Sequence, residues 1–209
     1  MRIDILTLFP KMFVGPFAES IIKRAQDKKL VEICLHDLRK WAKDKRKTVD
    51  DRPYGGGAGM ILKIDLLDQA LTSLRQPKTK VILLDAGGEK FTQSKALQLS
   101  QEKHLIIICG HYEGVDHRVH EHLADEVISI GNYVLTGGEL PAMVILDTVV
   151  RLLPGAIKKE SLTEESFSGV KSGKEYPQYT RPEVYRGWKV PKVLLTGNHA
   201  EIKAWRSSP

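Results

Sequence analysis

The most informative stretch of this 209-residue chain is Ser129-Ile130-Gly131-Asn132-Tyr133-Val134-Leu135-Thr136-Gly137-Gly138-Glu139-Leu140-Pro141. A short β-type run leads into it, and Pro141 opens an almost wholly apolar segment, Ala142 to Leu153. Glycines at this density let the backbone approach a ligand or another backbone closely. The order of strand, glycine loop and apolar helix therefore indicates a ligand held by main-chain groups. Because the spacing fits neither G-x-G-x-x-G nor a Walker loop, a simple tight turn is the alternative.

Two further strands are expected to end in glycine-bearing loops. Val81 to Leu84 is followed by Asp85-Ala86-Gly87-Gly88, and the most apolar run, Leu105 to Cys109, is followed by Gly110-His111-Tyr112-Glu113-Gly114. Continuous apolar strands that alternate with helical patterns indicate a parallel sheet covered on both faces, and thus the α/β class. Ligands bind beyond the carboxyl ends of such strands. We therefore expect the three loops to converge on one pocket.

Hydrophobic spacing predicts the remaining elements. Strands are expected over Ile3 to Leu8 and over Leu30 to Leu35, and Asp65 is expected to cap a helix. The helices predicted from apolar residues at helical spacing are Phe17 to Ala25, Ile64 to Leu74, Ser94 to Gln101, Val119 to Leu123 and Asn198 to Arg206.

The composition changes after Pro154 to Lys, Glu, Ser and Gly with little apolar periodicity, which is typical of a linker with low intrinsic order. We therefore expect three parts along the chain. They are an α/β domain over residues 1–158, a flexible linker over 159–178 and a short, truncated helical segment over 179–209.

The net charge of +6 and the isoelectric point near 9.2 suggest a polyanionic partner. The two cysteines, Cys34 and Cys109, each lie in an apolar run, which indicates buried thiols in a reducing compartment. The N-terminus lacks the continuous apolar region of a signal peptide, and the run Ala142 to Leu153 is too short to span a bilayer. We expect a soluble, cytoplasmic protein.

Two segments carry clustered positive charge. Lys43 to Lys47 together with Arg52 could contact phosphates, and the alternative is a solvated surface loop. Residues 179–209 hold six Lys or Arg against two Glu, with Tyr and Trp between them. This mixture suits nucleic acid, because cations pair with phosphates and aromatic rings stack on bases. A small mixed core built on Trp188 and Trp205 is the alternative.

Four closely spaced histidines raise the question of a metal site. No further ligands stand at a recognised spacing, so we favour a solvated helix and expect no metal site. Those histidines are His111, His117, His120 and His122. Glu113 lies in a glycine loop at a strand end, where a carboxylate is a candidate for a functional site. Glu164-Glu165, in the expected linker, are by themselves a solvated charge pair.

Several motifs, in order along nearly the whole chain, resemble the bacterial tRNA guanine-N1 methyltransferase family of the SPOUT class. That family methylates the guanosine just 3′ of the anticodon. The matching segments are Leu8-Phe9-Pro10, Thr48 to Gly57, Cys109 to Gly114, Ser129 to Pro141, Tyr179-Thr180-Arg181-Pro182 and Leu195 to Ile202.

The resemblance implies a homodimer with an active site shared between subunits, tRNA as partner, and a deep trefoil knot, a rare exception to the rule that chains do not thread loops. It also implies that the three glycine loops form the knot and hold S-adenosylmethionine, with Mg²⁺ as an optional second cofactor. The cofactor positions it implies are Leu84, Gly110, Tyr112, Ile130, Gly131, Asn132, Tyr133, Val134, Leu135, Gly137, Gly138 and Pro141.

The resemblance also implies a mechanism. Guanine N1 is a poor nucleophile until a base removes its proton, and a carboxylate on a mobile segment can act as that base. This role falls on Glu165, where the family has an Asp before Ser-Phe. Arg151 matches an arginine that reaches the partner subunit's site and stabilises charge on guanine O6. Glu113 matches a residue that contacts the guanine edge, and the expected substrate-binding residues are Tyr179, Arg181 and Arg52.

The chain departs from the family pattern at a few positions. Asn132 stands where the family usually has Asp, Asp85-Ala86-Gly87 replaces Ser-Pro-Gln, and Gln178 replaces a His. Two competing hypotheses accompany the enzyme. One is a non-catalytic tRNA-binding relative of the same fold. The other is a nucleotide-phosphate enzyme built on Gly55 to Gly59, which lacks the Lys-Ser/Thr of a Walker loop.

Overall fold

The computed structural model describes residues 1–167 and 175–207. The chain forms two compact units, Met1–Lys159 and Glu160–Pro209, and each is described by itself. The predicted linker residues 168–174 and the last two residues of the predicted C-terminal segment lie outside the described residues. Within the described residues, no helix is both long and apolar enough to cross a membrane.

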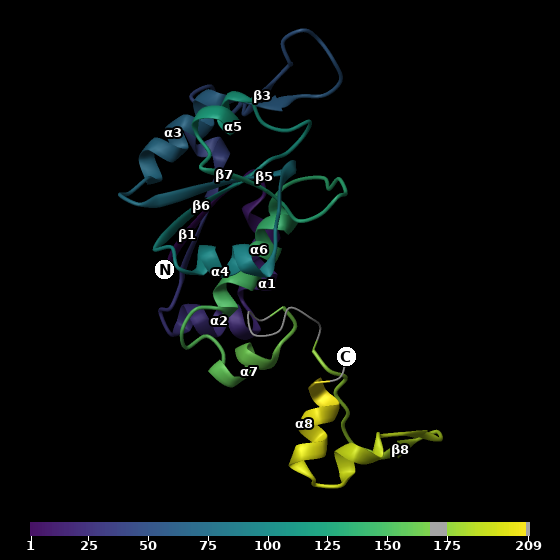
Figure 1. Ribbon diagram of the computed structural model, residues 1–209. Coiled ribbons are helices and arrows are strands. Elements are labelled where there is room, and N and C mark those ends of the chain that lie inside the picture. The colour runs from purple at the N-terminus through teal and green to yellow at the C-terminus, as the bar shows by residue number, and fades with distance from the viewer. Residues whose placement is uncertain (168–174, 208–209) are drawn as a thin grey trace. The chain divides into compact units, whose positions relative to one another are not determined.

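A five-stranded parallel sheet forms the centre of the first unit (Figure 1). The strand order is β2-β1-β6-β5-β7, and every neighbouring pair is parallel. This confirms the predicted α/β class with a parallel sheet. The strands are β1 Arg2–Thr7, β2 Glu32–Asp37, β5 Thr79–Lys90, β6 His104–Cys109 and β7 Glu126–Ser129, and a separate antiparallel pair joins β3 Asp50–Asp51 to β4 Ile61–Leu62.

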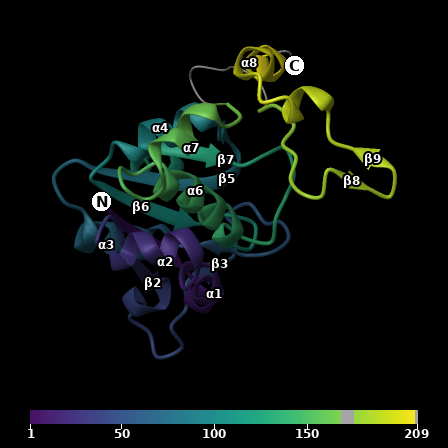
Figure 2. The ribbon, with the colours of Figure 1, turned by 90° about the horizontal axis from the view of Figure 1, so that it is seen from below.

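Helices cover both faces of the sheet, as Figures 1 and 2 show from two directions. One face carries η1 Pro10–Phe13, α1 Val14–Phe17, α2 Ser20–Asp27, α4 Gln93–Ser100 and α6 Glu139–Arg151. The other carries η2 Leu38–Trp41, α3 Ile64–Leu74 and α5 Arg118–His122.

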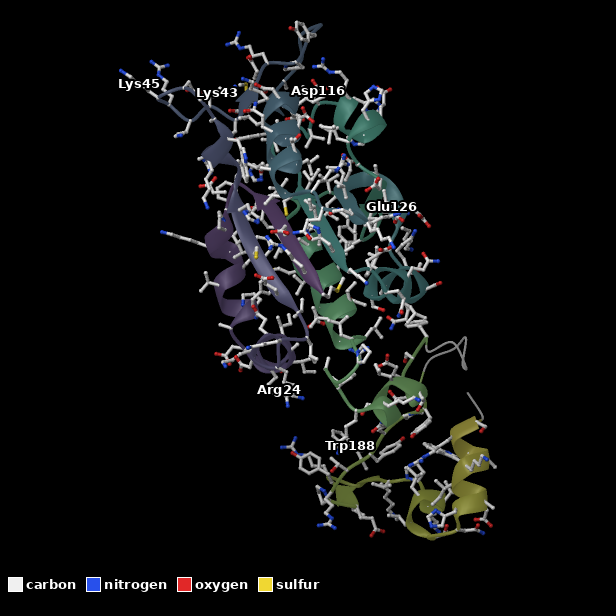
Figure 3. All side chains as sticks on the ribbon, turned by 90° about the vertical axis from the view of Figure 1, so that its left-hand side faces the viewer. Arg24, Lys43, Lys45, Asp116, Glu126 and Trp188 are labelled. Carbon is white, nitrogen blue, oxygen red and sulfur yellow. The ribbon has the colours of Figure 1, made fainter. Side chains whose placement is uncertain are left out.

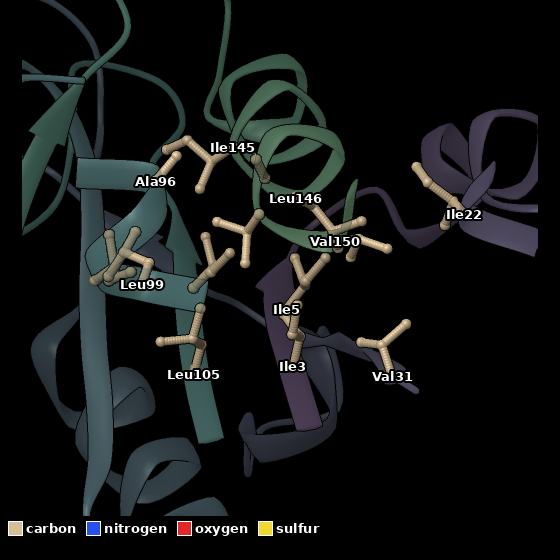
Figure 4. Packing of buried hydrophobic residues seen from close by; sticks show 14 of the residues in the cluster. Ile3, Ile5, Ile22, Val31, Ala96, Leu99, Leu105, Ile145, Leu146 and Val150 are labelled. Carbon is tan, nitrogen blue, oxygen red and sulfur yellow. The ribbon is translucent and has the colours of Figure 1, made fainter. Parts of the chain in front are cut away.

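Strand residues alternate between two hydrophobic clusters, one on each face of the sheet. In β6, Leu105 and Ile107 pack on the α6 side, whereas Ile106 and Ile108 pack on the α3 side. All six residues of β6 are buried, which explains its continuous apolar sequence. Each fully buried Ile or Leu side chain contributes about 1.5–3 kcal/mol relative to exposure. Figure 4 shows the α6 side, where Ile3, Ile5 and Leu105 lie opposite Ile145, Leu146 and Val150.

The spacing of apolar residues explains why residues 139–151 form the helix α6. Its buried residues recur at helical spacing and form one apolar face against the sheet. Pro141 lies in the first turn, where its missing N–H has no intrahelical partner to lose. The buried apolar residues are Ala142, Ile145, Leu146, Val149 and Val150.

Two local predictions are wrong. The loop expected at Asp85 is part of β5, which continues to Lys90 and pairs with β7 again after a register shift. A Cβ at Gly88 would lie 2.7 Å from the backbone nitrogen of Ile128, so glycine here serves close strand approach. The helix α3 begins at Ile64 with Lys63 as N-cap, so Asp65 lies inside the first turn, where its charge favours the helix dipole.

The second unit contains α7 Lys159–Glu164, which begins at the unit boundary, followed by a hairpin of β8 Val184–Tyr185 and β9 Trp188–Lys189, η3 Lys192–Leu195 and α8 His199–Ser207. The predicted helix over Asn198 to Arg206 is confirmed within one residue. The Asn198 side-chain oxygen accepts a hydrogen bond from Ala200 N at 3.1 Å and so caps α8. Helix α7 occupies the first part of the segment predicted as a linker.

The aromatic residues of the second unit do not form the small core considered as an alternative. Trp188 is 71% exposed and its ring contacts Tyr185. Trp205 instead lies 6.4 Å from Tyr179, measured between ring centroids. These rings therefore form two separate pairs near the surface.

Candidate ligand-binding site

A cavity of about 190 Å³ lies beyond the carboxyl ends of β6 and β7 and beside Leu84 of β5. It brings together every predicted cofactor position except Asn132, whose side chain is exposed and does not line the cavity. The predicted residues that line it are Leu84, Gly110, Tyr112, Ile130, Gly131, Tyr133, Val134, Leu135, Gly137, Gly138 and Pro141. Glu113, Asp85 and His111 line it as well.

Two glycines let the loops that follow β6 and β7 touch each other. Gly138 N donates a hydrogen bond to Gly110 O at 2.8 Å, and a Cβ at Gly138 would lie 2.7 Å from the Cα of Cys109. The preceding residue, Gly137, forms an antiparallel β-bridge with His111, the residue after Gly110. Because backbone meets backbone here, a side chain at Gly138 would push the loops apart.

Tyrosines close two sides of the cavity. Tyr112 adopts a left-handed backbone with φ of 60°, which costs a non-glycine residue about 1–3 kcal/mol. Burial and the nearby Asp50 carboxylate raise the pKa of the Tyr112 hydroxyl, which favours its neutral form. The ring of Tyr133 folds back over Gly131, where a Cβ would lie 2.4 Å from the ring. The rim is therefore aromatic and the floor is main chain.

The hairpin β3–β4 packs on the loop that follows β6. Glu113 N donates to Met60 O at 3.1 Å, and Leu62 N donates to Gly114 O at 3.0 Å. Gly59 has φ of +76°, and a Cβ there would lie 2.4 Å from the Glu113 side chain. Glycine at position 59 thus lets the hairpin β3–β4 pack closely against Glu113.

Asp85 and His120 form a polar edge of the site. The Asp85 carboxylate accepts a hydrogen bond from Gly87 N at 2.8 Å, and its other oxygen lies 3.3 Å from His120 Nε2. His120 stacks on His117 with ring centroids 4.8 Å apart. Among the described residues, no group of three or more His, Cys, Asp or Glu could hold a metal ion.

Burial raises the pKa of the Cys109 thiol, and neither Cys109 nor Cys34 forms a disulfide.

One buried carboxylate was missed by sequence reasoning. Glu139, in the first turn of α6, is only 2% exposed and accepts a hydrogen bond from the Thr7 hydroxyl at 2.7 Å. A charged residue directly after two glycines and before a helix was visible in the sequence. Its burial was not, because Thr7 is 132 residues away along the chain.

The remaining predicted residues lie in different places. Arg151 is the last residue of α6 and is half-buried, and Arg52 is exposed on the hairpin. Glu165, Tyr179 and Arg181 belong to the second unit. Glu165 directly follows α7 and is half-buried, whereas Tyr179 and Arg181 are exposed. In the same unit the Arg206 guanidinium lies 4.7 Å from the centre of the Tyr176 ring.

The basic residues of the first unit lie at the surface. Lys43 and Lys45 project from the loop between η2 and β3 (Figure 3). Both side chains are exposed, which leaves them accessible to an anionic partner.

These features define an α/β domain of the class that binds a small ligand in loops at the carboxyl edge of a parallel sheet. The chain belongs to the family described as tRNA (Guanine-1)-methyltransferase TrmD, whose family model matches residues 1–209. The family expected from the sequence motifs is thereby confirmed.

Similar proteins cover nearly the same span. A tRNA (guanine-N(1)-)-methyltransferase of Chloroflexus aggregans is 55% identical over 211 residues, with 100% of this chain and 82% of the relative covered. Relatives with the same name from Geobacillus kaustophilus and Dictyoglomus turgidum are 57% and 55% identical, with 99% of this chain and 85% and 83% of the relatives covered.

Proposed function

We propose that this chain transfers a methyl group from S-adenosylmethionine to N1 of the guanosine that directly follows the anticodon in tRNA. The family match supports the reaction, and the names of the relatives state the same base and the same RNA class. The structural observation that carries the proposal is the cavity lined by residues 110–115, 128–131 and 133–138 at the carboxyl edge of the sheet.

The residues present fit this cofactor. Leu84, Ile130 and Pro141 offer apolar surface for an adenine ring, and the glycine loops offer main-chain donors and acceptors. When bound, S-adenosylmethionine supplies a methyl group on a positively charged sulfur. The cavity lining has no lysine or arginine, which suits a ligand with a cationic centre.

We assign the proton transfer to Glu165. Guanine N1 must lose its proton before or during attack, and a positioned carboxylate contributes about 10²–10⁴-fold to such a step. Arg151 would hold the negative charge that develops on guanine O6. Glu113 is exposed and lines the cavity, so it can accept hydrogen bonds from the guanine edge. Tyr179, Arg181 and Arg52 would hold the RNA.

We further propose that the loops after β6 and β7, together with the segment of β5 from Asp85 to Gly88, belong to a deep trefoil knot. The bond from Gly138 N to Gly110 O and the bridge between Gly137 and His111 support it, because they hold the two later loops together. We also propose that the chain is divided into a knotted domain over residues 1–158, a linker over 159–178 and a C-terminal segment over 179–209. An experimental trace of residues 79–153 tests the knot, and limited proteolysis tests the division.

A homodimer with shared sites is also part of the proposal. Leu140 and Val144, one turn apart on α6, are 49% and 46% exposed, and Val134 in the preceding loop is 87% exposed. Large apolar side chains exposed together are typical of an interaction surface. This surface borders the cavity, since Val134 belongs to both.

We place the reaction in the cytoplasm. Measuring activity after chelation of Mg²⁺ tests whether the reaction uses this optional metal.

The function is tested by incubating the protein with methyl-labelled S-adenosylmethionine and an unmodified tRNA that has guanosine after the anticodon. We expect label in N1-methylguanosine after nuclease digestion, and none with a matched tRNA that has adenosine there. Absence of transfer from a protein that binds the cofactor would overturn the proposal. A non-catalytic relative would give that result.

A further inference from the structure

Glu139 is a buried carboxyl side chain beside the cavity that the proposed mechanism does not use. Burying a carboxylate is unfavourable unless partners compensate it. The N-terminal turn of α6 supplies part of this compensation, because the helix dipole is positive there. Two side chains on other segments also face it: the Thr7 hydroxyl donates a hydrogen bond to one oxygen, and His111 lies 4.0 Å from the other.

The bond between Thr7 and Glu139 has a fixed direction. The Thr7 oxygen accepts a hydrogen bond from Phe9 N at 2.9 Å. Its hydroxyl proton is therefore free to be donated to Glu139 Oε1, 2.7 Å away. This arrangement joins the end of β1 to the start of α6.

The second oxygen of Glu139 faces His111. Its Oε2 lies 4.0 Å from His111 Nδ1, within ion-pair distance and longer than a hydrogen bond. His111 Nδ1 is buried and has no hydrogen-bond partner within residues 1–167 and 175–207. A Cβ on Gly137 would lie 2.5 Å from both Glu139 Oε2 and His111 Nδ1. Glycine at 137 is therefore what lets these two groups approach beneath the loop.

His111 is held from two other sides as well. Its ring centroid lies 4.9 Å from that of Phe9 and 4.9 Å from that of Tyr112. His111 itself lines the cavity, as do its neighbours Gly110 and Tyr112. A change at Glu139 can therefore reach the cavity through the His111 ring and through the backbone on both sides of it.

We infer that Glu139 is a positioning residue for the cavity: its carboxyl group, hydrogen-bonded to Thr7 and facing His111 at ion-pair distance, fixes the loop after β6 against the loop after β7. The role rests on the proposed function, since the ligand of the cavity is S-adenosylmethionine. Glu139 itself touches neither the ligand nor the reacting atoms. Its effect is on affinity for the cofactor, and the chemical step proceeds once the cavity is filled.

Paired substitutions at His111 test the inference. His111→Asn keeps an N–H donor near the place of Nδ1, whereas His111→Phe keeps the ring and removes the donor. Calorimetric titration of the full chain with S-adenosylmethionine should show the Kd raised about tenfold or more in His111→Phe. In His111→Asn it should stay within about threefold of the unsubstituted chain. With saturating cofactor, kcat should change less than KM in both variants.

A second pair covers the case in which His111→Phe does not fold. Thr7→Ser keeps the hydroxyl and should retain affinity, and Thr7→Val removes it and should lose affinity. In the double variant Glu139→Gln/His111→Phe, the loss of cofactor affinity should not exceed that of Glu139→Gln alone, because both substitutions act through one contact.

Glu126→Gln is the matched control. It removes a half-buried carboxylate that is paired with Lys80 and Lys95 and lies outside the cavity lining. It should lower stability and leave Kd unchanged.

Equal losses in His111→Asn and His111→Phe, or losses that multiply in the double variant, would overturn the inference. Failure of the unsubstituted chain to bind S-adenosylmethionine would instead overturn the proposed function, and the inference with it. The two failures are distinguished by the first titration.

Discussion

Asp4 Oδ2 and His104 Nε2 lie 2.6 Å apart in the middle of the sheet, and Asp4 is fully buried. The same carboxylate also accepts hydrogen bonds from Arg2 and lies 2.6 Å from His36 Nε2. Burial alone would raise the pKa of Asp4, but the bonds with His36, Arg2 and His104 lower it well below its usual value. This cluster joins β1 to both of its neighbours, β2 and β6.

Stability should depend on pH through Asp4. A carboxyl whose pKa is lower in the folded state contributes stability that is present above its unfolded pKa, near 3.8, and is lost as pH falls below it. Urea unfolding at pH 7, 5 and 3 should show the largest loss between the last two values. Asp4→Asn should lower stability at pH 7 by about 3–5 kcal/mol. It should also reduce this dependence on acid, and an unchanged acid slope in Asp4→Asn would contradict the assignment.

Gly138→Ala should damage the cavity. The new methyl group would meet the backbone of Cys109, so the stability should fall by about 1–3 kcal/mol and cofactor affinity by about tenfold or more. Gly15→Ala is the matched control, because nothing lies within 4 Å of its added Cβ. Thermal unfolding and calorimetry on both variants give the comparison. Equal behaviour of the two would show that the loops separate without cost.

Glu165→Gln should lower kcat by about 100-fold or more, since it removes the proposed base. Glu165→Asp should keep measurable activity, because a carboxylate remains. Cofactor affinity should stay within about twofold in both, because the cavity is formed by the unit Met1–Lys159. Single-turnover methylation measures the rate, with Glu183→Gln as an exposed control in the second unit. Full activity in Glu165→Gln would point to another base.

Arg151 can be assigned to its own subunit or to the partner's site by complementation. In the proposed homodimer, Arg151→Ala and Gly138→Ala should each have strongly reduced activity when assayed at a low cofactor concentration. In a purified heterodimer of the two, one site would combine an intact cavity with the other subunit's arginine, so about half of the activity should return. An inactive heterodimer would show that the arginine serves the site of its own chain.

Lys43 and Lys45 should contribute to tRNA affinity through phosphate contacts. Replacing either by Gln should reduce the slope of log Kd against log salt by about 0.7–0.9. Lys23→Gln is the control, because Lys23 is paired with Asp27 at 2.6 Å on α2. Binding measured across a salt series separates the two. An unchanged slope would favour the solvated-loop interpretation.

Much of the fold could be predicted because it depends on local patterns. The continuous apolar run of β6 predicts a strand buried on both faces, and the helical period of α6 predicts a helix with one buried face. The loop at Asp85 was misplaced because Gly87 and Gly88 are turn signals in sequence, and only the approach of β7 shows that they continue a strand. Asp65 was misread as a cap for a similar reason, since capping depends on a backbone angle at Lys63.

The candidate site was predictable in part for the same reason. Its main-chain loops were visible as glycines at strand ends, and its residues came from motifs in the family. Glu139 could not be found this way, because its role depends on Thr7 at the end of β1 and on His111 in the loop after β6. Contacts between distant segments leave no local spacing to recognise.

The contact between the hairpin β3–β4 and Glu113 has a thermodynamic consequence. Two backbone bonds tie this hairpin to the wall of the cavity, so Arg52, which we propose contacts RNA, is mechanically coupled to the loop after β6. If RNA bound at the hairpin favours the filled cavity by some factor, the cofactor must favour RNA by that same factor. The coupling factor measured for RNA affinity with and without cofactor should therefore equal the factor measured for cofactor affinity with and without RNA.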